Sequence, residues 1–231
     1  MKILSKILQF LKSIPRYFKS ESFHHYLKTL KYSLYVILHP FDGFWDLSHE
    51  KRGSLAAANT IVILTLLTNL WDKRFTSFMF NNTRWNTVNV FQVMAGILLP
   101  LAIWVAANWS LTTLMDGKGK LKDIYIATAY AFTPYVIIGL PLIVISNVIT
   151  SEEGAFYTYF KAFALIWCVF LILAGMMMTH DYSLAKGLVS SLLSIVGMAI
   201  IIFLLLLFFS LISDAVNYVI SVVKEIIFRV S

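Results

Sequence analysis

The stretch GSLAAANTIVILTLLTNLW, residues 53–71, runs without a single charged side chain. A bilayer core of about 30 Å needs roughly 20 apolar residues in helical form, because each backbone polar group must bond within its own segment. Four more stretches meet this requirement, at about 88–115, 124–150, 162–179 and 188–213. The sequence therefore predicts an all-α, polytopic membrane helix bundle with five transmembrane helices.

The composition agrees with a membrane protein and excludes several other classes. Of 231 residues, 59% are hydrophobic, 15% are aromatic and 13% are charged, whereas a soluble domain carries about a quarter charged residues. The aromatic content excludes a disordered chain, and the scarcity of charge excludes a coiled coil. Because Cys168 is the single cysteine, a disulfide-rich secreted fold is excluded as well.

The position of the basic residues predicts the orientation in the membrane. The formal charge is +7, and nine of the 19 Lys and Arg residues lie within the first 54 positions. No nucleic-acid-binding motif accompanies them, so we expect no nucleic-acid partner. With five spans, one side of the membrane receives 13 basic residues and the other receives six. Since basic residues stay in the cytoplasm, we expect a cytoplasmic N-terminus and an extracytoplasmic C-terminus in the plasma membrane.

Three regions follow from this pattern. Residues 1–34 contain a basic amphipathic helix, ended by Pro15, that lies in the headgroup plane. The five-helix domain covers residues 35–213, and residues 214–231 form an amphipathic C-terminal helix. Segment 32–38 is too short to cross the bilayer and stops before His39-Pro40, which indicates an interfacial or re-entrant element.

The chain shows little sign of catalytic chemistry. The five predicted cores contain no Asp, Glu, Lys, Arg or His, which argues against a proton-coupled pump or a voltage sensor. Metalloprotease, nucleophile-elbow and phosphate-loop motifs are missing, and the segment 116–120 (DGKGK) is interpreted as a flexible turn. A metal site drawn from His39, His49 and His180 with nearby acidic residues lacks metal-ligand spacing. We therefore expect no enzyme, and no catalytic, cofactor-binding or metal-binding residue.

Small and polar residues in the spans predict where helices pack. Because lipid provides no hydrophobic force between helices, close approach depends on small residues and hydrogen bonds. Two prolines, Pro134 and Pro141, predict a bend in the third span. Packing is the favoured interpretation, and a substrate-lining path is the alternative. The candidate packing residues are Ala102, Ala106, Asn108, Ser110, Pro134, Ser190, Ser194 and Gly197.

A set of short motifs follows in a fixed order along the chain. They are HPFD at 39–42, NWS at 108–110, DGKGKLKDI at 116–124, AYAFTPY at 129–135 and MMTHDYS at 177–183. Over about residues 35–212 this order resembles a bacterial member of the Ypt-interacting-protein (Yip) domain family. The resemblance implies five transmembrane helices and a cytoplasmic N-terminus. Eukaryotic relatives are small-GTPase partners and membrane-shaping factors. This sequence lacks their Asp-Leu-Tyr-Gly-Pro motif and long N-terminal cytosolic region, so a Rab-type partner is not carried over.

Two hypotheses for function follow. The leading one is a non-enzymatic membrane protein that organises the membrane or assists other membrane proteins through its cytoplasmic loops. Self-association into a homo-oligomer is a further hypothesis. The alternative is a transporter, or a transporter accessory subunit, for a neutral or lipid-like solute that passes polar faces near Asn108 and Pro134. The candidate partner-contact residues are His39, Pro40, Asp42, Lys118, Lys120, Lys122, His180 and Asp181.

Overall fold

The computed structural model describes residues 21–81, 85 and 88–230, and all the regular elements in that part of the chain are helices. They are α2 (Glu21–Leu38), α3 (Pro40–His49), α4 (Leu55–Phe75), α5 (Val90–Thr112), α6 (Leu121–Ala131), α7 (Thr133–Ile145), α8 (Gly154–His180) and α9 (Leu184–Val230). Five segments of this part are long and apolar enough to cross a membrane: α4, α5, α6 with α7, α8 and α9. The predicted all-α bundle with five candidate spans is confirmed. The proposed amphipathic helix before Pro15 lies outside the described residues.

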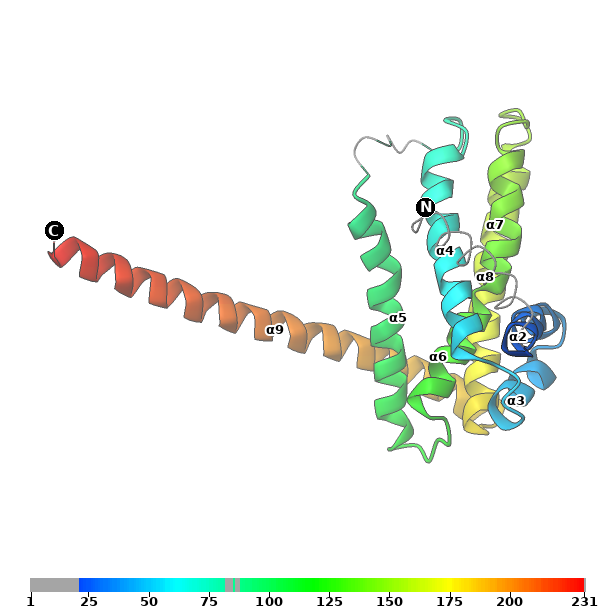
Figure 1. Cartoon of the computed structure of the whole chain (residues 1–231), viewed down its shortest axis with the longest axis horizontal. Coiled ribbons are helices and arrows are strands. Elements are labelled where there is room, and N and C mark those ends of the chain that lie inside the picture. Colours follow the sequence, from blue (N-terminus) through cyan, green and yellow to red (C-terminus); the bar gives the residue numbers. More distant parts are fainter. Residues whose placement is uncertain (1–20, 82–84, 86–87, 231) are drawn as a thin grey trace, which may run out of the picture.

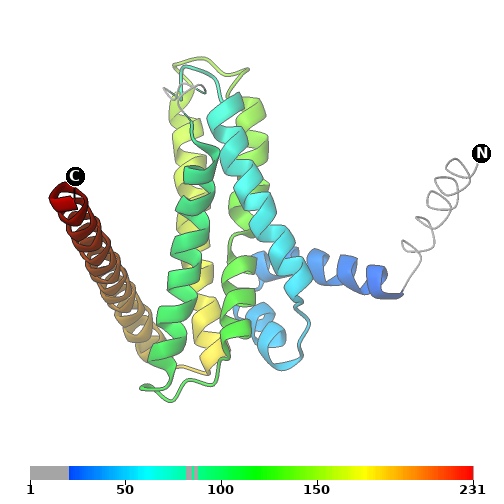
Figure 2. The same ribbon diagram turned by 60° about the vertical axis from the view of Figure 1, so that its left-hand side comes forward.

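The bundle is built from α4, α5, α7 and α8, which run side by side along its long direction (Figures 1 and 2). Helix α4 begins where the Ser54 hydroxyl accepts a hydrogen bond from the Ala57 amide at 3.1 Å, which satisfies one of the free N–H groups of a helix start. Lys73 and Arg74 occupy its last turn, where positive charge complements the helix dipole.

The third span is interrupted, as its prolines predict. Helix α6 ends at Ala131 and α7 begins at Thr133, directly before Pro134. Proline has no N–H to donate to the carbonyl four residues earlier, and here the Thr133 hydroxyl donates to the Tyr130 carbonyl instead, at 2.6 Å. Helix α7 then continues through Pro141 to Ile145, so the interruption is at the first of the two prolines.

Helices α2 and α3 precede the first span and pack against the bundle near one end. Helix α2 lies across the direction of the spans (Figure 2), stops at Leu38 before His39-Pro40, and is not among the candidate spans. It continues unbroken through the boundary placed at 34/35 by the sequence. Helix α3 packs on α8 through the fully buried Phe44, whose ring faces Gly175.

Helix α9 is longer than the sequence analysis expects. It runs for 47 residues, or about 70 Å, which is more than twice the thickness of a bilayer core. The expected end at residue 213 is not observed, because no Gly or Pro follows Gly197 to interrupt the helix. Beyond its contact with α5, α9 leaves the bundle (Figure 1), and residues 202–229 are exposed. Residues 214–230 are thus helical but continuous with the fifth span.

Two glycines provide a matched test of this packing. A Cβ atom at Gly43 would lie 2.9 Å from the Cα atom of Val36, whereas one at Gly96 would meet nothing within 4 Å. Alanine gains about 1 kcal/mol of helix propensity at either position, but at Gly43 it forces α2 and α3 apart at a cost of about 1–3 kcal/mol. We expect Gly43→Ala to lower the midpoint of thermal unfolding in detergent and Gly96→Ala to raise or preserve it. Equal midpoints for the two variants would contradict the packing of α2 on α3.

Candidate functional site

Three of the sequence motifs meet at a buried histidine. His180, at the end of α8, is 1% exposed. Its Nδ1 accepts a hydrogen bond from the Gly119 amide at 3.1 Å, so Nε2 carries the proton and donates to Asn108 Oδ1 at 2.8 Å. The Asn108 amide nitrogen in turn donates to Ser194 Oγ on α9 at 2.9 Å. This chain of bonds joins α5, α8, α9 and the loop between α5 and α6.

The next residue, Asp181, links the same loop to α3. It ends α8 in a left-handed conformation, with φ of 56°, and its amide donates to the Met177 carbonyl. Its carboxylate lies 2.9 Å from Lys118 Nζ and 3.3 Å from His49 Nε2. The hydrogen bond from Lys118 lowers the pKa of the Asp181 carboxyl below its ordinary value.

The loop 116–120 is packed against this cluster rather than left as a free turn. A Cβ atom at Gly119 would lie 2.6–2.8 Å from atoms of the His180 ring and of Thr179, and one at Gly117 would lie 2.5 Å from the Tyr182 hydroxyl. Only glycine lets the loop backbone come this close. The interpretation of DGKGK as an unconstrained turn is therefore replaced by a loop that requires its two glycines for packing.

The other candidate contact residues lie apart from this cluster. His39, Pro40 and Asp42 belong to the start of α3, whereas Ser48 and His49 at its end reach the cluster, where Ser48 donates to the Thr179 hydroxyl at 3.2 Å. Ten helical residues separate the two ends by about 15 Å. Within the described ranges, no group of three or more His, Cys, Asp or Glu side chains is placed to hold a metal ion.

Two lysines of the loop remain exposed beside the cluster. Lys120 and Lys122 are both exposed, and neither takes part in any ion pair found among residues 21–81, 85 and 88–230. The Lys120 backbone amide is held by the Asp123 carboxylate at the start of α6, at 3.4 Å. We call the face built from residues 116–123, residues 181–183 and the α3 end at 48–49 the motif surface; Gly119 and Tyr182 are buried within it.

The candidate packing residues differ in how deeply they are buried. Asn108, Ser190 and Ser194 are buried, and Gly197 faces Ala107 across the contact between α5 and α9. Pro134 is buried at the start of α7. Ala106 is half-buried, whereas Ala102 and Ser110 are exposed on α5.

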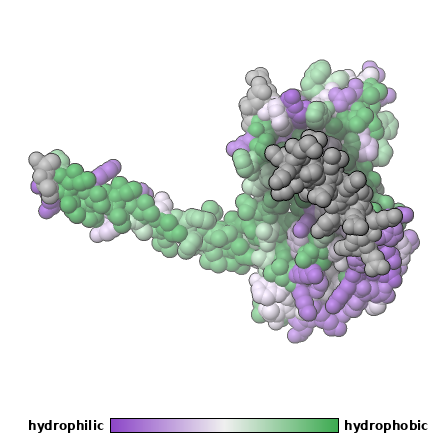
Figure 3. Space-filling view, in the orientation of Figure 1, coloured by the Kyte–Doolittle hydropathy of each residue, from purple (hydrophilic) through white to green (hydrophobic). Residues whose placement is uncertain are grey.

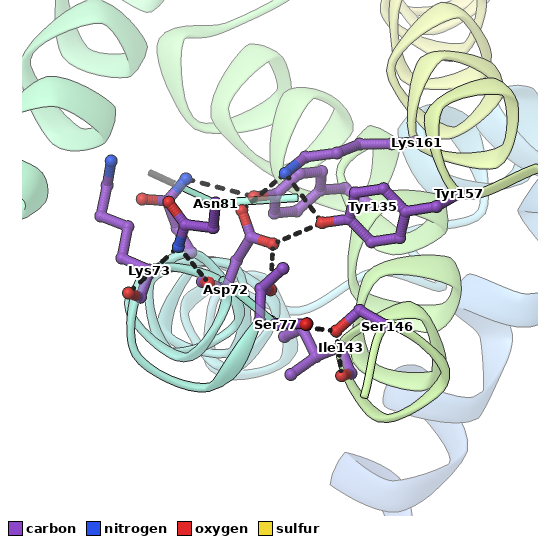
Figure 4. A network of polar contacts seen from close by, with 11 residues as sticks. Asp72, Lys73, Ser77, Asn81, Tyr135, Ile143, Ser146, Tyr157 and Lys161 are labelled. Carbon is purple, nitrogen blue, oxygen red and sulfur yellow. Dashed lines mark hydrogen bonds and ion pairs between the residues drawn. The ribbon is translucent and has the colours of Figure 1, made fainter. Parts of the chain in front are cut away.

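A second polar network (Figure 4) joins the last turns of α4 to the start of α8, at the end of the bundle opposite α3 in Figure 1. Lys161 Nζ on α8 lies 2.7 Å from Asp72 Oδ2 on α4, and the Tyr157 hydroxyl donates to Asp72 Oδ1 at 3.2 Å. The apolar stretches do not reveal this pair, because the first stretch ends just before Asp72 and the fourth begins just after Lys161. One feature of the sequence could have predicted the pair. In a five-span topology, the end of span one and the start of span four lie on the same side of the membrane, so Asp72 and Lys161 can meet there.

Replacing the buried imidazole should release the loop. In His180→Phe, the Gly119 amide and Asn108 Oδ1 lose their partner at a cost of about 1–3 kcal/mol each. We expect faster trypsin cleavage after Lys118, Lys120 and Lys122 in solubilised protein, read by peptide mass spectrometry. His39→Phe is the matched control, because His39 only stacks on Tyr35 and phenylalanine retains the ring. Equal cleavage of both variants would show that His180 does not hold the loop.

The carboxylate at 181 should stabilise the fold only where it is ionised. Because its pKa is lower in the folded protein than in the unfolded chain, its contribution is complete above about pH 4 and is lost as the pH falls further. We expect Asp181→Asn to destabilise the protein at pH 7 by less than about 1 kcal/mol, since the pair is partly exposed. The difference from the unmodified protein should shrink below pH 4. Chemical unfolding at several pH values measures this, with Asp42→Asn as the control.

The comparisons with known proteins agree with the motifs. The family model described as the Yip1 domain matches residues 34–219, which is more than half of the chain. Searches of curated proteins and of solved structures gave no match. The Yip resemblance seen in the sequence is thereby confirmed, and the candidate spans fit it. The chain is an integral, multi-pass membrane protein that belongs to the Yip1 domain family.

Proposed function

We propose that this protein is a non-enzymatic membrane component that organises or assists other membrane proteins through the motif surface. The polar groups that shape this surface are used internally: His180 and Asn108 bond each other, and Asp181 bonds Lys118. These bonds hold the loop 116–120 in place, and the bonded groups are therefore not available to act on a substrate. A partner protein would contact the exposed side chains of this surface, chiefly Lys120 and Lys122.

The single observation that carries the proposal is the pair of exposed lysines on a fixed frame. Lys120 and Lys122 stand at the start of α6 on a backbone held by Asp123. Hydrophilic side chains gather at this end of the molecule (Figure 3), where Figure 1 places α3 and the connection from α5 to α6. Basic side chains on a fixed surface favour an acidic segment of a partner protein, because charge complementarity steers encounter and selects the partner.

The same charges support the orientation of the chain. Lys51, Arg52 and the three loop lysines stand at the end that carries the motif surface. Since basic residues remain on the cytoplasmic side of a bilayer, we place the motif surface in the cytoplasm and the Asp72–Lys161 pair at the extracytoplasmic side of the plasma membrane.

A polar path past Asn108 and Pro134 receives less support. Asn108 is 1% exposed, and both polar atoms of its side chain are bonded. Pro134 is buried at the start of α7. Uptake of a solute by reconstituted protein that depends on either side chain would favour the transporter alternative over the motif surface.

Charge reversal at the two free lysines tests the proposal. The double variant Lys120→Glu/Lys122→Glu should lose most copurification of an in vivo crosslinked membrane partner, measured by quantitative mass spectrometry. Insertion should persist, because 11 of the 13 basic residues expected on this side of the membrane remain. Lys224→Glu is the matched control, since Lys224 is also an exposed lysine, on α9. An unchanged set of partners in the double variant would refute the proposal.

A further inference from the structure

A large apolar cleft lies beside α5 and extends toward the end of the bundle opposite the motif surface. It has a volume of about 620 Å³ and lies between α4, α5, α7 and α8. We call it the α5 cleft; its apolar wall includes Ile97, Pro100, Trp104, Phe132, Leu165 and Val169. It exists because α5 packs mainly on α9 and α6, and makes few contacts with α4. Its volume is in the range of sites that bind small molecules.

The end of the cleft toward the start of α5 is polar. Asn69, Asp72 and Lys161 line it, and a second hollow of about 420 Å³ adjoins it, sharing Asn69 and Gly96 and adding Lys73. Asp72 and Lys161 neutralise each other at 2.7 Å. Lys73 has no ion pair in the described part of the chain, and its side chain extends away from Asp72 (Figure 4). The mouth therefore carries one positive charge that has no carboxylate partner among the described residues.

Two polar groups beside the cleft are short of hydrogen bonds within the described part of the chain. Pro100 has no N–H to donate to the Gly96 carbonyl, so this acceptor, at an exposed glycine in the cleft, is left free by its own helix. The indole N–H of Trp104 is buried with no hydrogen-bond partner. Of the two groups, the Gly96 carbonyl belongs to an exposed residue that lines the cleft, and a hydroxyl group of a bound molecule would donate to it.

We infer that the α5 cleft binds one anionic glycerophospholipid of the bilayer, with its phosphate at Lys73 and an acyl chain along the wall between α5 and α8. The positive mouth selects an anionic headgroup, and the apolar wall accepts hydrocarbon.

The inference is tested on the full chain purified in detergent and titrated with phosphatidylglycerol or phosphatidylcholine of identical acyl chains. Native mass spectrometry counts bound lipid. We expect one phosphatidylglycerol to bind at least tenfold more tightly than phosphatidylcholine. Lys73→Gln should abolish this preference, whereas Lys224→Gln, the same charge change at an exposed site on α9, should retain it.

A second pair of variants tests the hydrocarbon wall independently of charge. Gly96→Leu places a side chain in open space inside the cleft and also favours the helix, so it should prevent binding without unfolding the protein. Ala102→Leu adds a side chain to an exposed position of α5 outside the cleft and should leave binding intact.

Three results would overturn the inference. They are equal binding of the two lipids, equal loss of binding in the test and control variants, and crosslinks that place a second copy of the chain in the cleft. The first two results would indicate non-specific contact with lipid, and the third would indicate a protein partner. Selective binding of phosphatidylglycerol that is lost in the test variants alone requires both the charged mouth and the apolar wall of the α5 cleft.

Discussion

The hydrogen bond between His180 and Asn108 is the interaction on which the arrangement of the spans depends. Helices in lipid gain no hydrophobic force by associating, and an interhelical hydrogen bond contributes about 0.6 to 2 kcal/mol. Here one imidazole and one amide bond in series to Gly119 and Ser194. Through them α8 is joined to α5, α9 and the loop before α6, at one end of the bundle.

The two ends of the bundle use polar groups differently. At the motif surface, the neutral side chains of His180 and Asn108 are buried and hydrogen-bonded, whereas Lys120 and Lys122 are exposed. The exposed basic side chains therefore lie over a hydrogen-bonded layer. At the opposite end, the charges of Asp72 and Lys161 lie between helices and cancel each other. Pairing offsets the cost of placing an ion near lipid, which lets α4 and α8 extend beyond the uncharged stretches.

Hydropathy and helix breakers made most of the fold predictable. Five apolar stretches gave five candidate spans, and the interruption follows from Pro134. The ends of the spans were less predictable, because a charged side chain stops an apolar stretch whether or not a partner on another helix neutralises it, as Asp72 and Lys161 show. The motifs located Asn108, His180 and Asp181, but their bonds depend on packing between α5, α8 and α9 that no local pattern encodes. The continuity of α9 through residue 213 could have been predicted, because the sequence has no Gly or Pro after Gly197 to interrupt the helix.

The position of the α5 cleft follows from where α5 is held. Asn108 ties the C-terminal end of α5 to α8 and α9, and the starting half of the helix has no comparable bond to α4. Pro100 removes one backbone hydrogen bond in the middle of α5, and Gly96 has no side chain with which to fill the space beside it. A helix held at one end, with a glycine facing the open space near the other, leaves room beside that glycine. The bond that orders the motif surface thus also determines which side of the bundle is left open to lipid.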